Sequence, residues 1–84
     1  MDRSAVIASP AQLAAVLRGR RTTCDLTQKQ VGTKVGLLPK TISGLESDPG
    51  RSSVASLFKL LSALGLELVL QPKPSTKTTS QAEW

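Results

Sequence analysis

Apolar residues recur at helical spacing in the first third of the chain, beginning just after Ser9 and Pro10. A serine side chain can accept orphan backbone N–H bonds at a helix start, and proline fits the first helical position without losing a needed donor. Two β-branched polar residues, Thr22 and Thr23, precede a short loop over residues 24–26. The pattern therefore predicts a helix whose inward face is formed by Leu13, Ala14, Leu17 and Arg21.

A second predicted helix runs from Gln28 to Val35, between clear start and stop residues. Thr27 is a favourable N-cap, and Gln30 stands at the capping-box position from which its side chain can reach back. Gly36 can adopt the left-handed conformation that ends a helix and turns the chain sharply.

The chain then enters a third predicted helix, which begins at about Leu38 and Pro39. Proline again suits the first helical position. Ile42 and Leu45 are spaced to point inward on one face of this helix. Two short helices joined by a tight glycine turn result.

A dense turn signal over residues 47–50, Ser-Asp-Pro-Gly, separates the third helix from a fourth. Ser52 or Ser53 can cap this helix, which is expected from about Val54 to Leu64, and Gly65 closes it. Its broad apolar face predicts that this helix is the centre of the core; the face consists of Val54, Leu57, Phe58, Leu60, Leu61 and Leu64.

The segment Leu66–Gln71 alternates apolar and polar positions except at Val69, which predicts one short strand. A lone strand leaves its backbone unpaired, so we expect it to pair with the same strand of a second copy or with Val6 and Ile7 of its own chain. The expected dimerisation residues are Leu66, Leu68, Val69 and Leu70. Residues 72–84 lack apolar periodicity and are expected to be a disordered tail, after an arm over residues 1–8 and a domain over residues 9–71.

The composition narrows the possible functions. The 84 residues carry a formal charge of +5, which favours a polyanionic partner such as nucleic acid or an anionic membrane. Histidine is absent and Cys24 is the only cysteine, so we expect no zinc site, no Cys/His or Ser/His nucleophile and no enzymatic activity. No glycine-rich phosphate loop suggests a cofactor, and no segment resembles a signal peptide or membrane span. We therefore expect a cytoplasmic protein without metal or membrane association.

The segment from Leu26 to Glu46 resembles the phage-repressor-like helix-turn-helix family. In that family Thr-Gln opens the second helix, a glycine marks the turn, and Ile-Ser and a glutamate follow in the third, as Thr27, Gln28 and Gly36 and then Ile42, Ser43 and Glu46 do here. The pair Val31-Gly32 departs from the pattern, because alanine usually stands second; Gly32 is expected to cost helix stability without blocking close packing. The resemblance implies a mostly α-helical, lambda-repressor-like bundle of four to five short helices plus the dimerising strand.

Beyond this segment, the chain is similar to the HipB-type antitoxins, partners of HipA-type kinases. The similarity extends from Ser9-Pro10 to the Leu66–Gln71 strand and to the terminal Glu83-Trp84. It implies a dimeric antitoxin that binds palindromic operator DNA, represses its own operon and neutralises a HipA-like Ser/Thr kinase toxin. The alternatives are a stand-alone repressor and a partner-binding protein without specific DNA recognition.

A major groove admits one α-helix, whose leading residues reach base edges while the preceding helix anchors on phosphate. Lys40 can reach guanine acceptors or phosphate, whereas Leu38 and Thr41 can touch thymine methyl groups. Pro39 offers no donor, and because HipB relatives tend to have polar residues at positions 38 and 39, the operator is expected to differ from theirs. The DNA-binding residues are predicted to be Thr27, Gln28, Lys29, Lys34, Leu38, Pro39, Lys40, Thr41 and Ser43.

Three further predictions concern residues outside this set. The resemblance implies that Arg21 and Glu46 pair across the core in a structural role. Arg18 and Arg20 are expected to be exposed and available to DNA. Trp84, the only tryptophan, is expected to bind a partner, because a tryptophan fills a pocket with a large apolar area and, by analogy with HipB tails, has an anchoring or degradation-signal role. The alternative is an accidental exposed aromatic.

Overall fold

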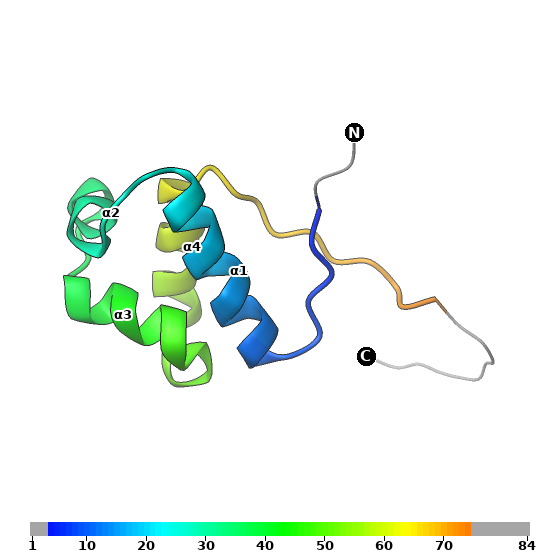
Figure 1. Ribbon diagram of the computed structural model, residues 1–84. Helices are drawn as coiled ribbons and strands as arrows, with labels where there is room; N and C mark the ends of the chain where they lie inside the picture. The colour runs from blue at the N-terminus through cyan, green and yellow to red at the C-terminus, as the bar shows by residue number, and fades with distance from the viewer. Residues whose placement is uncertain (1–3, 75–84) are drawn as a thin grey trace.

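A computed structural model describes residues 4–74 as a small helical bundle (Figure 1). Its elements are α1 (Pro10–Thr23), α2 (Gln28–Val35), α3 (Pro39–Ser47), the 3-10 turn η1 (Pro49–Arg51) and α4 (Val54–Ala63). The mostly helical fold predicted from the pattern is thereby confirmed, with α4 ending one residue earlier than expected. Within the described residues, no helix combines the length and apolar character that crossing a bilayer requires.

The helix starts follow from local side-chain caps. The Ser9 hydroxyl accepts a hydrogen bond from the Gln12 backbone N–H at 3.2 Å, and Pro10 occupies the first position of α1. At α4 the capping serine is Ser53, whose hydroxyl accepts from the Ser56 N–H at 3.0 Å. These bonds satisfy backbone donors that a helix start otherwise leaves without a partner.

The loop between α1 and α2 contains a feature that the sequence did not predict. Asp25 has a backbone φ of 59°, in the left-handed region where a non-glycine residue is uncommon but aspartate is tolerated. Its N–H donates to the Thr22 carbonyl at 2.9 Å, and the Leu26 N–H returns to the Arg21 carbonyl at 3.1 Å. These two bonds fix the turn through which the chain leaves α1 and leads to α2.

The core lies where the four α-helices meet. Leu17, Ile42 and Leu60 are fully buried, and they come from α1, α3 and α4. Val31 is fully buried as well, so that α2 contributes an apolar side chain to the same cluster. Other members of the cluster are Leu45, Leu61 and Leu64, and partly buried leucines pack around it at 13, 26, 37, 57 and 66.

The predicted apolar face of α4 was too broad. Leu60, Leu61 and Leu64 are buried as expected, but Val54 is 66% exposed and Phe58 is 51% exposed. Only a stripe of a helix surface can face a bundle on one side of it, so residues at the edges of a wide apolar face lie outside the contact. In the single chain these two side chains therefore belong to the surface.

Beyond α4 the chain leaves the bundle in an extended conformation, after a turn at Gly65 with a φ of 68°. Residues 4–74 contain no assigned strand, so the alternative pairing of Leu66–Gln71 with Val6 and Ile7 does not form in the described chain. Leu68 to Leu70 are exposed there, and pairing with a second copy stays a prediction. Trp84 and most of the predicted tail lie outside the described residues.

Candidate nucleic-acid interface

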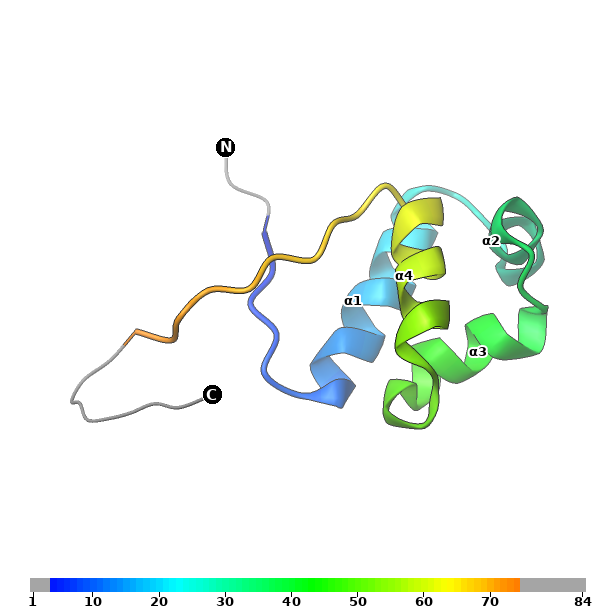
Figure 2. The ribbon, with the colours of Figure 1, turned by 180° about the vertical axis from the view of Figure 1, so that it is seen from behind.

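Helices α2 and α3 form one end of the described chain, and the segments before α1 (residues 4–9) and after α4 (residues 66–74) extend from the other (Figures 1 and 2). The turn between these helices passes through Gly36, which has a φ of 73°, and Leu37, whose N–H donates to the Gly32 carbonyl at 2.8 Å. The N–H of Gly36 also donates to the Gly32 carbonyl. The sequence-predicted helical pair and its glycine turn are thus present at an end of the bundle that is open to a large partner.

Gly32 allows a close approach within this pair. A Cβ atom built on Gly32 would overlap the Leu37 carbonyl oxygen, and it would lie 3.3 Å from the Leu37 carbonyl carbon. Because both are backbone atoms of the turn, they cannot move aside as a flexible side chain would. Besides the expected cost to helix stability, this position therefore has a packing reason to be glycine, and the sequence alone did not reveal it.

Arg21 and Glu46 form an ion pair between α1 and α3. Arg21 Nε lies 2.5 Å from Glu46 Oε2, and Arg21 Nη2 donates to Glu46 Oε1 at 2.9 Å, so the contact is bidentate. The Glu46 side chain is only 3% exposed. The hydrogen bond that the guanidinium donates to Glu46 raises the pKa of Arg21 above the ordinary value, so the guanidinium stays charged at physiological pH.

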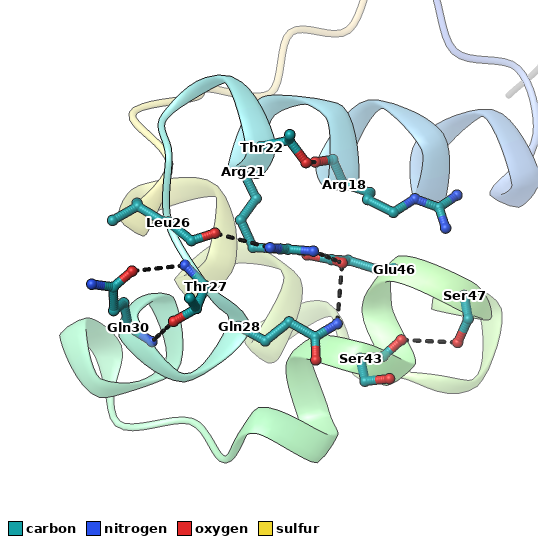
Figure 3. A network of polar contacts seen from close by, with 10 residues as sticks. All are labelled: Arg18, Arg21, Thr22, Leu26, Thr27, Gln28, Gln30, Ser43, Glu46 and Ser47. Carbon is teal, nitrogen blue, oxygen red and sulfur yellow. Dashed lines mark hydrogen bonds and ion pairs between the residues drawn. The ribbon is translucent and has the colours of Figure 1, made fainter.

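The same pair extends into a network that includes α2 (Figure 3). Arg21 Nη1 donates to the Leu26 carbonyl at 2.9 Å, which fixes the loop before α2. Gln28 Nε2 donates to Glu46 Oε1 at 3.3 Å, so the first residue of α2 is tied to the buried carboxylate of α3. Sequence reasoning expected the pair but missed this bond of Gln28, which nothing in the spacing of the residues indicates.

The start of α2 presents unpaired backbone donors. The capping box uses the Thr27 N–H, which donates to Gln30 Oε1 at 2.8 Å, and the Gln30 N–H, which donates to Thr27 Oγ1 at 3.0 Å. Within residues 4–74, the N–H groups of Gln28 and Lys29 have no hydrogen-bond partner. Such donors at a helix start favour an anion, since they add to the positive end of the helix dipole.

The start of α3 is apolar instead. Leu38 is its N-cap residue, makes no side-chain cap and is 66% exposed. The N–H groups of Thr41 and Ile42 both donate to the Leu38 carbonyl, at 2.9 and 3.2 Å, and Pro39 has no N–H. Apart from the N–H groups of Leu38 and Lys40, which have no partner within residues 4–74, this helix start presents aliphatic carbon to solvent, whereas α2 presents polar groups.

An open cleft of about 530 Å³ brings the two helix starts together. Thr27, Gln28 and Lys29 line it from α2 and its cap, and Pro39 lines it from α3. Lys40, Thr41 and Ser43 follow Pro39 along α3, where Thr41 is half-buried and the other two are exposed. Lys34 lies in the last turn of α2, so the cleft does not include it.

The cationic side chains divide into free and engaged groups. Lys29, Lys34 and Lys40 are exposed and make no ion pair with any described residue. Arg20 is an exception to the expectation for α1: its Nε donates to the Leu64 carbonyl at 2.9 Å and it is half-buried, so it joins α1 to the end of α4. The prediction that Arg20 is exposed and available to DNA was therefore wrong, whereas Arg18 is exposed.

Comparisons with known proteins agree on one family. A family model described as helix-turn-helix matches residues 17–71. Antitoxin HipB of Escherichia coli O6:H1 is 32% identical over 82 residues, which cover 93% of this chain and 87% of that protein. Antitoxin HipB of Escherichia coli K12 is 30% identical, with 93% of each chain covered.

Solved structures of HipB have the same fold. A complex of HipB with an O4 20mer superposes with a TM-score of 0.81 at 31% identity, over 84% of this chain and all of the other. A HipA–HipB–O2–O3 complex gives the same TM-score, identity and coverage.

Proposed function

Because the chain belongs to the helix-turn-helix family and within it to the HipB-type antitoxins, we propose that it represses its own operon and binds a HipA-type kinase toxin. The observation that carries the DNA-binding part is the joint surface of the two helix starts, with unpaired N–H donors on α2 and the exposed leading residues of α3. Helix α3 enters the major groove of operator DNA, and α2 crosses the phosphate backbone beside it.

The residues of α2 position the protein on the phosphates. The N–H groups of Gln28 and Lys29 face a phosphate oxygen, with Thr27 and the lysine side chain beside them, and Lys34 binds further along. Gln28 uses its side-chain amide to hold Glu46, so its backbone N–H and the second amide hydrogen are the groups left for phosphate. These contacts fix register and carry no sequence information.

The residues of α3 read the bases. Lys40 reaches guanine acceptors or a phosphate, and the hydroxyls of Thr41 and Ser43 can serve either as donors or as acceptors. The exposed pair Leu38 and Pro39 leads this helix, and it is there that an operator bound by this chain differs from one read by polar residues.

The protein acts as a dimer in this proposal. The extended segment Leu66–Gln71 pairs with its counterpart in a second copy, with Leu66 packed on the core and Leu68, Val69 and Leu70 covered by the partner. A two-fold dimer places two copies of α3 on half-sites about one helical turn, or a multiple of it, apart. Sedimentation at micromolar concentration is expected to give the mass of a dimer, and a monomer mass would contradict this part.

The toxin contact is proposed from similarity and from Trp84. This chain is similar in structure to a chain of a solved HipA–HipB–O2–O3 complex. That similarity supports a HipA-type kinase as the partner. Trp84 anchors on that partner or marks the chain for degradation. An alanine at position 84 is then expected to weaken toxin binding by about 2 kcal/mol, or to change proteolytic lifetime, and calorimetry with the kinase encoded beside this gene measures the first effect.

Two measurements separate the proposed function from its alternatives. In an electrophoretic shift assay, the protein is expected to retard the DNA upstream of its own gene at concentrations that leave a scrambled duplex free. It is also expected to co-purify with a kinase encoded by the adjacent gene. A shift without any kinase partner would indicate a stand-alone repressor, and a kinase partner without a shift would indicate a protein that only neutralises its partner.

A further inference from the structure

We propose that Leu38 selects a pyrimidine that carries a C5-methyl group, either thymine or 5-methylcytosine, in each operator half-site. This inference rests on the proposed binding of α3 in the major groove and adds the chemical feature that its leading residue recognises. In the major groove, the C5-methyl is the one apolar feature that distinguishes a base edge.

The position of Leu38 supports contact with a base. Its side chain is 66% exposed, although it sits within a tightly built turn whose next residue, Pro39, lines the cleft shared with Gln28 and Lys29. The start of α3 therefore lies beside the proposed phosphate contacts of α2. When α3 enters the major groove as proposed, the exposed leucine is buried against base edges.

Most of the first residues of α3 have no free backbone donor. Pro39 has no N–H, and the N–H groups of Thr41 and Ile42 are already bonded to the Leu38 carbonyl, so among residues 39–42 only the Lys40 N–H lacks a partner within residues 4–74. Guanine and adenine present polar groups across the groove, and unmethylated cytosine presents an amino group beside a bare C5–H. A leucine over such a polar group removes water without replacing its hydrogen bond. A C5-methyl group instead gains buried apolar area against the leucine.

Contacts on both sides of Leu38 order the backbone of the turn. The Leu37 N–H bonds to the Gly32 carbonyl at 2.8 Å, and Gly32 allows the Leu37 carbonyl to pack directly against α2. Pro39 follows Leu38, and its ring fixes its own backbone φ. Because the backbone is already ordered, the contact with a methyl group costs little further conformational entropy.

Replacing single thymines by deoxyuridine tests the proposal, since this change removes only the methyl group. The duplex is first chosen by selection from a random library with the full-length protein. At one position in each half-site, the change to deoxyuridine is expected to weaken binding about four-fold, the effect of one buried methyl group. If the selected base there is cytosine, methylation at C5 is expected to strengthen binding by a similar factor, which identifies the second source of the methyl group.

Two variants connect the methyl effect to this side chain. Leu38→Ala is expected to abolish the difference between thymine and deoxyuridine. Because Leu38 is exposed, the variant is expected to keep the wild-type melting temperature, which a thermal melt checks. Lys40→Ala, at the second residue after Leu38, is the matched control and is expected to bind more weakly while keeping the four-fold methyl effect. A wild-type protein that binds every methylated and unmethylated duplex equally, or a methyl effect that survives in Leu38→Ala, would overturn the proposal. If selection enriches no duplex at all, the proposed DNA binding itself is contradicted, which is a distinct result.

Discussion

The starts of α2 and α3 face the same cleft but differ in chemistry. At α2 a capping box leaves the N–H groups of Gln28 and Lys29 without partners in the described chain, whereas at α3 the exposed Leu38 and Pro39 present carbon. Polar donors of the first kind bind any phosphate, because every nucleotide has one. Aliphatic groups of the second kind respond to the base, because only some base edges are apolar. The start of α2 is therefore suited to positioning the protein on phosphates, and the start of α3 to recognising the base sequence.

The ion pair between Arg21 and Glu46 supports the α2 side of this comparison, so its loss is expected to have the largest effect. Arg21→Ala leaves the Glu46 carboxylate, 3% exposed, without its bidentate partner. Breaking a buried pair in this way costs about 3–5 kcal/mol of unfolding free energy. Urea denaturation measures it.

The matched control for this variant is Arg51→Ala. Arg51 Nε lies 3.9 Å from Asp48 Oδ2 with both side chains exposed, and the loss of Arg51 is expected to change stability very little.

The raised pKa of Arg21 also predicts how stability depends on pH. The stabilisation by Arg21 is fully present below the ordinary arginine pKa and is lost only when pH rises through the higher folded-state value. A loss of the Arg21 contribution between about pH 6 and about pH 9, well below the ordinary arginine pKa, would contradict this assignment to arginine.

On the α3 side, Lys40→Ala is expected to weaken operator binding by about 1–3 kcal/mol if the lysine reads guanine. Preference should also relax at a single base pair. Titration against duplexes that differ at one position measures both effects. A uniform loss of affinity over all sequences would indicate that Lys40 contacts a phosphate. Positioning on the phosphates would then extend from α2 into α3.

The close packing of α2 on the turn predicts a smaller effect on stability from Gly32→Ala. Alanine is favoured over glycine in a helix by about 1 kcal/mol, but overpacking against backbone costs about 1–3 kcal/mol, so a net destabilisation is expected. Gly19→Ala is the matched control, because a Cβ at position 19 in α1 meets nothing within 4 Å and should raise the melting temperature. Equal stabilisation by both variants would show that the turn can shift.

The smallest effect is expected from removing residues 75–84. The segment carries few apolar residues and is remote in sequence from α2 and α3. The melting temperature and operator affinity should both stay nearly unchanged, while toxin affinity or proteolytic lifetime changes. A large drop in melting temperature would show that these residues pack on the domain.

Local signals in the sequence were sufficient to predict the helices. Ser9 and Thr27 cap helices by bonding to residues three positions on, and Gly36 ends α2 through its own backbone conformation. The sequence alone therefore predicts these helix starts and the turn. The family resemblance supplied the pairing of Arg21 with Glu46, which are far apart in sequence.

Features that depend on which surfaces meet could not be predicted in the same way. Phe58 has the hydrophobicity of a core residue, yet it lies at the edge of the stripe that α4 buries. Arg20 and Arg21 are neighbours in sequence, but Arg20 donates to the Leu64 carbonyl whereas Arg21 pairs with Glu46. The approach of the Leu37 carbonyl to Gly32 likewise depends on how two helices pack. The proposed pairing of Leu66–Gln71 with a second copy also depends on a surface that lies outside its own chain.

The most direct test of the division between α2 and α3 is a comparison of Gln28→Ala with the wild type over every single-base-pair variant of the selected operator. If α2 only positions the protein, the variant should lose the same factor in affinity on every duplex, so that the two specificity profiles coincide after scaling. Lys40→Ala, measured on the same duplexes, should instead flatten the profile at one position. A base-specific loss from Gln28→Ala would contradict the account.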